Sequence, residues 1–211
     1  CFLFFVIPTL LSACAVGNTY DYRLLAKPIP VSGGGVVALT VVDERSYILD
    51  GDKDADFVGL QRGGFGNPFD VTTVSGRPMA EDMTQALKDA LEREGFRVVI
   101  VVNNQPADRE SLARRARAEG APRVVLLRIK EWKTDVAMRI TLHYDLRLFV
   151  FDDSGAVLAE NSTDGVTVIG GATVMPSAVS GPARRAFEEK IGQLFYPPEI
   201  GEALSSGPES L

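Results

Sequence analysis

A strict alternation of apolar and polar residues from Met138 to Val150 constrains the fold of this chain more than any other feature. Seven apolar side chains recur at every second position: Met138, Ile140, Leu142, Tyr144, Leu146, Leu148 and Val150. The residues between Arg139 and Arg147 on the opposite face are polar or charged. Because side chains of a β-strand alternate between the two faces of its sheet, this segment predicts a long strand with one face buried and the other exposed or lightly covered.

The segments before this strand predict the order βαβα. Residues 36–42 are mostly β-branched, which is typical of a strand covered on both faces. Apolar residues at helical spacing in 79–91 predict a helix, and Gly95 stands where such a helix would end. Residues 96–102 predict a second strand, and Asp108 is placed to cap a short helix after it.

The segments after this helix predict a strand meander and a final helix. Residues 123–132 indicate a third strand, and the turn at 152–155 joins the alternating strand to another that starts at Ala156. A last helix is predicted from Ala183 to Phe195, after Ser180-Gly181-Pro182. This order indicates an α/β fold of the α+β kind, a mixed β-sheet with helices packed mainly on one face.

A short apolar leader opens the chain. Residues 2–11 are almost wholly apolar, and such a run is too short to span a bilayer. We interpret the leader as N-terminally truncated, because no Met or basic segment precedes it. Two alternatives are an ordinary secretory signal cut nearby and a buried first helix.

The end of the leader resembles the lipobox of bacterial lipoproteins, an apolar residue and two small residues before a cysteine. Leu11, Ser12 and Ala13 fit the signal-peptidase recognition positions, and Cys14 fits the lipid-bearing first residue. The resemblance implies a diacylglyceryl group on the thiol and acylation of the new amine, which together anchor a protein durably. Ala15 follows where lipoproteins retained in the inner membrane usually have Asp, so the outer membrane, with the protein facing the periplasm, is favoured.

We predict four parts in the chain. Residues 1–13 are the signal peptide, and the Pro- and Gly-rich residues 14–35 form a lipidated tether. Residues 36–195 form a single periplasmic domain, and 196–211 form a disordered tail.

Composition excludes several classes of function. A net charge of −6 gives no general attraction to phosphate backbones, so we expect no nucleic-acid partner. The only cysteines are Cys1 and Cys14, which leaves no thiol in the predicted domain for a disulfide or a metal. No Gly-x-Ser-x-Gly motif accompanies His143, the only histidine, for which we favour a surface or cross-strand role. We therefore expect no cofactor and no enzymatic activity.

Residues 43–74 are predicted to be mostly loop, with a short strand possible at 69–74. Alternate aspartates in 50–56 suit Ca²⁺, but the EF-hand pattern fails at Ala55 and Gln61, so we favour a solvated acidic loop and predict no metal site. Gly63–Gly66 predicts a turn rather than a phosphate loop, because no helix and lysine follow.

Two surface features are candidates for contact with a partner. Trp132, Phe149 and Phe151 form a possible apolar partner surface, and the alternative is that a helix covers them. The basic run 114–117 is interpreted as the solvated face of a helix, since acidic residues adjoin it.

Three short elements resemble the YajG-like bacterial lipoproteins over roughly residues 36–150. Residues 41–45, which end in Asp43-Glu44-Arg45, look like the Asp-x-Arg element of that family. Val58-Gly59 resembles its Gly-rich loop, and 79–99 its helix-strand unit. The resemblance implies an outer-membrane-anchored periplasmic domain without a catalytic set. For Asp43 and Arg45 we favour a structural ion pair.

Two functional hypotheses follow. The leading one is a non-catalytic, lipid-anchored binding or scaffold lipoprotein that acts on an envelope protein or a cell-wall component. The alternative is an accessory lipoprotein of a lipid or solute transport system that holds a small apolar ligand. The alternative predicts an apolar pocket lined by residues such as Leu87, Leu142 and Phe187.

Overall fold

The computed structural model describes residues 18–63, 65–101, 108–171 and 177–205. Its eight strands form one mixed sheet. The strands are β1 (Thr19–Tyr20), β2 (Val36–Asp43), β3 (Phe57–Arg62), β4 (Pro68–Thr73), β5 (Arg97–Ile100), β6 (Arg123–Val136), β7 (Arg139–Asp152) and β8 (Val157–Gly171). The helices are α1 (Ser46–Leu49), α2 (Met79–Arg93), α3 (Arg109–Ala118), α4 (Ser177–Phe195) and α5 (Pro198–Ser205).

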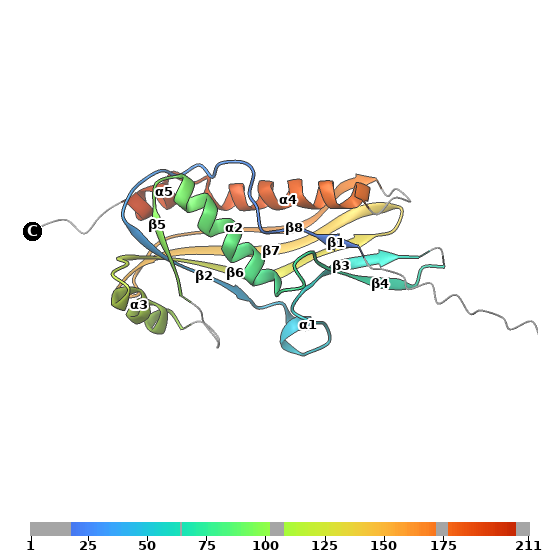
Figure 1. Cartoon of the computed structure of the whole chain (residues 1–211), viewed down its shortest axis with the longest axis horizontal. Helices are drawn as coiled ribbons and strands as arrows, with labels where there is room; N and C mark the ends of the chain where they lie inside the picture. Colours follow the sequence, from blue (N-terminus) through green and yellow to red (C-terminus); the bar gives the residue numbers. More distant parts are fainter. Residues whose placement is uncertain (1–17, 64, 102–107, 172–176, 206–211) are drawn as a thin grey trace, which may run out of the picture.

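The long strand β6 organises the sheet. On one side it pairs antiparallel with β7, which pairs antiparallel with β8. On its other side the first half of β6 pairs with β2 and the second half with β3, both parallel. The sheet therefore divides beyond β6 into a β2–β5 branch and a β3–β4–β1 branch at opposite ends of the strand (Figure 1).

Helices pack mainly on one face of this sheet, which confirms the predicted fold class. Side chains of α2, α4 and α5 share one core cluster with the inward side chains of β2, β6 and β7. Helix α3 packs on the opposite face, where Leu112 and Ala116 contact a smaller cluster that contains Phe151. We call the face under α2 and α4 the inner face and the one partly under α3 the outer face. Among the described residues, no helix is long and apolar enough to cross a membrane.

Two predicted helix ends are confirmed. Asp108 caps α3, since its carboxylate accepts hydrogen bonds from the backbone N–H groups of Glu110 and Ser111. Gly95 follows α2 with a φ of 99°, a left-handed conformation that favours glycine.

The expectation of a tether over 14–35 is wrong from Asn18 onward. Strand β1 extends the sheet, and the segment after it packs in the core through Tyr20, Tyr22, Leu25, Ile29 and Val31. Hydrogen bonds join this segment to α2 and α4, from Arg93 to the carbonyl of Leu25 and from the N–H of Ala26 to Glu188. The apolar residues lack helical or strand spacing, so only tertiary contacts reveal that they are buried. Residues 18–35 therefore belong to the packed domain, which does not begin at residue 36.

The expectation of a disordered tail is also wrong for residues 196–205, and residues 206–211 lie outside the described residues. Residues 198–205 form α5, whose Ile200, Ala203 and Leu204 are buried. Tyr196 and Pro197 separate this helix from α4, and Pro198 is the first residue of α5, a position where a missing N–H costs little.

The predicted loop over 43–74 contains more regular structure than expected. Strand β3 and helix α1 were not predicted, and the possible strand at 69–74 is present as β4. Strand β3 is six residues long, and its buried part is confined to the first three, so its alternation is too short to recognise.

Candidate functional site: the open face of the sheet

A β-bulge in β6 decides which side chains reach the open face. The register with β7 shifts between Ile129 and Glu131. Before the bulge Val125, Leu127 and Ile129 point inward, and after it Trp132 and Val136 do. The bulge therefore turns Lys133 and Asp135 toward the outer face.

The predicted partner surface of Trp132, Phe149 and Phe151 is wrong. Trp132 is fully buried on the inner face, where it makes edge-to-face contacts with Tyr22 and Phe187. Phe151 is fully buried under α3, and only Phe149 is partly exposed, beside the guanidinium of Arg128. The bulge and the cover of α3 separate three residues that the sequence pattern placed on one surface.

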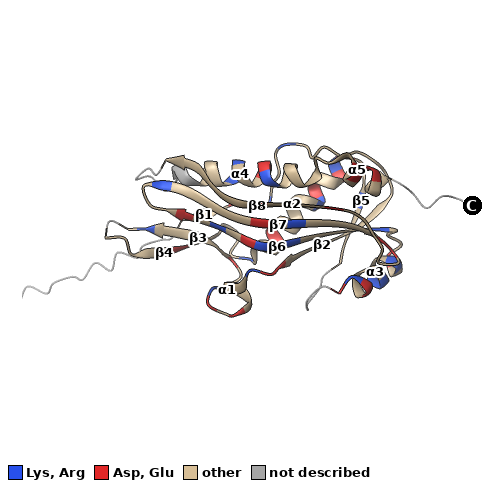
Figure 2. Cartoon of the chain, turned by 180° about the vertical axis from the view of Figure 1, so that it is seen from behind, with Lys and Arg blue, Asp and Glu red and all other residues tan. Residues whose placement is uncertain are grey.

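The outer face of β6, β7 and β8 instead presents charged residues in rows across the strands. In register, Arg128 lies opposite Arg147, and Glu131 lies opposite Asp145. Asp145 in turn lies opposite Asp164 of β8, which extends the acidic row. Figure 2 shows these basic and acidic segments beside one another on β6 and β7. Like charges directly opposite one another are unfavourable, so this face is not arranged for stability alone.

Ion pairs along the strands connect neighbouring rows. Arg147 contacts Asp145 at 3.3 Å and Lys133 contacts Glu131 at 3.2 Å. Glu44, which follows β2, contacts Arg128 and Lys130, each at 2.7 Å. The face is thus polar and internally paired, with both signs of charge available to a partner.

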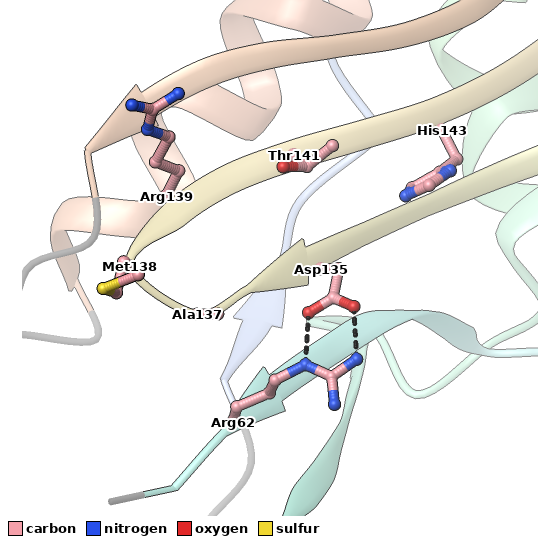
Figure 3. Close-up of a pocket in the computed structure, with 7 residues that line it drawn as sticks. All are labelled: Arg62, Asp135, Ala137, Met138, Arg139, Thr141 and His143. Atoms are coloured by element: carbon pink, nitrogen blue, oxygen red, sulfur yellow. Dashed lines mark hydrogen bonds and ion pairs between the residues drawn. The ribbon is translucent and has the colours of Figure 1, made fainter. Parts of the chain in front are cut away.

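A hollow lies at the end of this face where β3, β6 and β7 meet. It is lined by Arg62, Asp135, Ala137, Met138, Arg139, Thr141 and His143, and has a volume of about 410 Å³ (Figure 3). Arg62 forms two hydrogen bonds to the carboxylate of Asp135, at 2.9 and 2.6 Å. These hydrogen bonds hold the pKa of Asp135 below its ordinary value, although partial burial opposes the shift.

The predicted Asp43–Arg45 ion pair is confirmed, and it supports the junction of β2, β3 and β6. The fully buried Arg45 contacts the carboxylate of Asp43 at 2.6 Å. Its second guanidinium nitrogen donates to the carbonyls of Phe57 at 2.6 Å and Trp132 at 3.1 Å. Since Phe57 begins β3 and Trp132 follows the bulge, this one side chain ties three strands together.

The other candidates from the sequence lie on the surface. Asp50, Asp52 and Asp54 are exposed, and the described residues contain no group of three or more His, Cys, Asp or Glu side chains able to hold a metal ion. Gly63 and Gly66 belong to the β3–β4 turn, in which Gly63 donates to the carbonyl of Asn67, and Gly64 lies outside the described residues. His143 is half-buried in the outer-face hollow, opposite Lys133.

The structure tests two further predictions, the solvated basic run at 114–117 and the apolar ligand pocket. Arg114, Arg115 and Arg117 are exposed on α3, which confirms a solvated helix face. Leu87, Leu142 and Phe187 are fully buried in one packed cluster. The finding counts against an apolar ligand pocket between helix and sheet at these residues.

The structure does not test the predicted lipobox. Its residues lie outside the described part of the chain: Leu11, Ser12, Ala13 and Cys14.

The fold and the open sheet face define the class of this protein as a mixed α+β domain with one free sheet surface. Its fold is shared with protein XCC0632 from Xanthomonas campestris, which is 12% identical. That match covers 88% of this chain and 95% of the other, with a TM-score of 0.51.

Two further solved structures are similar at lower scores. They are the PelC dodecamer from Paraburkholderia phytofirmans (13% identity, 81% and 94% covered, TM-score 0.42) and the LpoB C-terminal domain from Salmonella enterica (17% identity, 70% and 95% covered, TM-score 0.35). No family model matches the chain, so the resemblance to YajG-like lipoproteins stays a prediction. No curated protein matches it either.

Proposed function

We propose that this protein is a non-catalytic, lipid-anchored binding module of the bacterial cell envelope that uses the outer sheet face to bind an envelope protein or a cell-wall component. Cys14 carries the lipid, and the domain faces the periplasm from the outer membrane. The lipobox pattern from Leu11 to Cys14 supports the anchor.

The open outer face is the observation that carries the binding role. On the inner face the long strands are covered by helices and by the segment from Asn18. On the outer face α3 covers only the end that contains Phe151. The basic row with Arg128 and Arg147 and the acidic row with Glu131 lie beyond it. Fixed rows of both signs of charge provide electrostatic complementarity for a polar partner. They also disfavour partners whose charges would face like charges.

The anchor is tested by Cys14→Ser. We expect the variant to leave the membrane fraction of cells, because no acyl chain then holds it. A variant that stays wholly in the membrane fraction would contradict the anchor.

The binding face is tested by a photo-crosslinking residue at Val166, which is exposed on the outer face of β8 opposite His143. In intact cells we expect one discrete adduct, which Arg147→Glu reduces because it reverses the charge of one residue in the basic row. The matched control carries the crosslinker at Arg114, on the exposed face of α3. Equal adducts at both positions, or adducts unaffected by Arg147→Glu, would contradict the assignment.

A further inference from the structure

Two hairpin tips with exposed apolar residues project from the same end of the sheet. Phe65 is fully exposed in the turn between β3 and β4, and Met138 is 91% exposed between β6 and β7. Gln61 near the end of β3 lies in register with Val136 at the end of β6, so the two turns leave the sheet together (Figure 1). Neither side chain is packed within the described structure, although both are large and apolar.

Two arginines lie close to these tips in the chain, Arg62 at the end of β3 and Arg139 at the start of β7. Arg62 and Arg139 line the hollow with Met138, and the hydroxyl of Thr141 lies between them and His143 (Figure 3). Arg62 is bound to Asp135, whereas Arg139 has no ion-pair partner among the described residues. Guanidinium groups bind phosphate oxygens well, and apolar side chains beside basic ones are typical of surfaces that enter a membrane interface.

The chain enters the fold at this same end. The side-chain amide of Asn18 donates to the side chain of Gln61, and the carbonyl of Asn18 accepts from the N–H of Thr72. Only four Cα–Cα steps separate Asn18 from Cys14. At about 3.8 Å a step, these span at most about 15 Å.

We propose that the two hairpin tips contact the phospholipid surface that holds Cys14. Phe65 and Met138 enter the headgroup region, and Arg139, with Arg62, binds lipid phosphate. This inference rests on the proposed anchor and deepens it. Because the segment from Asn18 is packed, a lipid on Cys14 holds this end of the sheet close to the bilayer, with α3 at the distant end.

The test uses the lipidated protein in vesicles of phosphatidylethanolamine and phosphatidylglycerol. Lipidation occupies the thiol of Cys14, so Phe65→Cys or Met138→Cys adds the only free thiol of the mature chain for an environment-sensitive fluorophore. We expect emission at shorter wavelength than from the matched Arg114→Cys label on α3, and quenching by a lipid that carries a quencher near its headgroup. Labels at 65 and 138 that are as water-exposed as the label at 114 would overturn the proposal.

A second variant tests the phosphate contact. With the label at position 65, Arg139→Gln should reduce the quenching, because one of the two guanidinium groups is lost. Unchanged quenching would overturn the role of Arg139. A failure of the anchor is distinct from both results, because the protein would then not join the vesicles at all.

Discussion

The two faces of β6 and β7 differ in what covers them, although adjacent residues supply both. Trp132 and Leu142 are fully buried on the inner face, whereas Lys133 and His143, the next residues along each strand, lie half-buried on the outer face. The inner face is an aromatic and aliphatic core shared by segments far apart in the sequence. The outer face carries paired charges. Stability therefore resides mainly in the inner face, and the outer face is the one for which we propose a role in recognition.

The largest expected effect concerns the inner face. Trp132→Ala should lower the free energy of unfolding by about 3–5 kcal/mol, because it leaves a cavity beside Tyr22 and Phe187. Equilibrium urea unfolding measures this change. Lys133→Ala, one residue away on the outer face, should change it by less than about 0.5 kcal/mol. Similar losses of unfolding free energy in the two variants would contradict the conclusion that stability resides mainly in the inner face.

A comparable loss is expected where Arg45 joins the strands. Arg45→Ala leaves Asp43 and the carbonyls of Phe57 and Trp132 without their partner. Removing one member of a buried ion pair costs about 3–5 kcal/mol. Lys53→Ala, which breaks an exposed pair with Asp70, is the control and should cost less than about 1 kcal/mol. Chemical denaturation of both variants checks the difference, and a loss confined to the control would refute the role of Arg45.

Two aspartates should give opposite dependences of stability on pH. Burial raises the pKa of Asp82, which lies in the first turn of α2 and accepts a hydrogen bond from Ser75. The folded state therefore holds this proton more tightly than the unfolded state, and the stabilisation is lost as pH rises through the folded pKa. Asp135 on the outer face has a lowered pKa, so its contribution is present above the ordinary value and is lost as pH falls through the folded pKa.

Unfolding measured from acid to neutral pH tests this contrast. The stability of Asp82→Asn relative to wild type should increase as pH rises. The stability of Asp135→Asn relative to wild type should decrease. Parallel curves for the two variants would contradict the assigned causes of the shifts.

The smallest expected effect lies within the charged rows. Asp164→Asn relieves repulsion from Asp145 directly opposite it and also removes the attraction of Asp164 to Arg147, which is one step away diagonally. The directly opposite pair is the closer one, so stability should rise by roughly 0.5 kcal/mol or less. Ser162→Ala on the same face of β8 serves as the control and should cause no gain. Thermal unfolding at low salt, where surface charges are least screened, gives the best sensitivity. A loss of stability in Asp164→Asn would mean that the attraction to Arg147 outweighs the repulsion from Asp145.

The elements with strong local signals were predictable from the sequence. The alternation ending at Val150 marks β7 because one face is buried along its whole length. Gly95 and Asp108 mark helix ends because their conformational and capping preferences are local. The Asp43–Arg45 pair followed from a family resemblance and not from spacing.

The candidate site was not predictable, because it depends on long-range contacts. A single bulge after Ile129 reverses the orientation of Trp132, and no residue type signals it. The burial of Tyr22 and Leu25 depends on α4 and α2, which lie far away along the chain. The hollow at Arg62 and Asp135 requires β3 to lie beside β6, and β3 has too short a pattern to recognise.

The packing of the first described segment has a consequence for the order of folding. Tyr22 contacts Phe187 of α4 at a ring separation of 5.2 Å, across most of the chain. Closing so long a loop is entropically costly, and contacts of high sequence separation form slowly. During synthesis, which starts at the N-terminus, this segment is made long before α4. The surface against which it packs is therefore incomplete until α4 has been made. The core thus closes late, and a chain that ends before α4 should leave Tyr22 and Leu25 exposed to proteases.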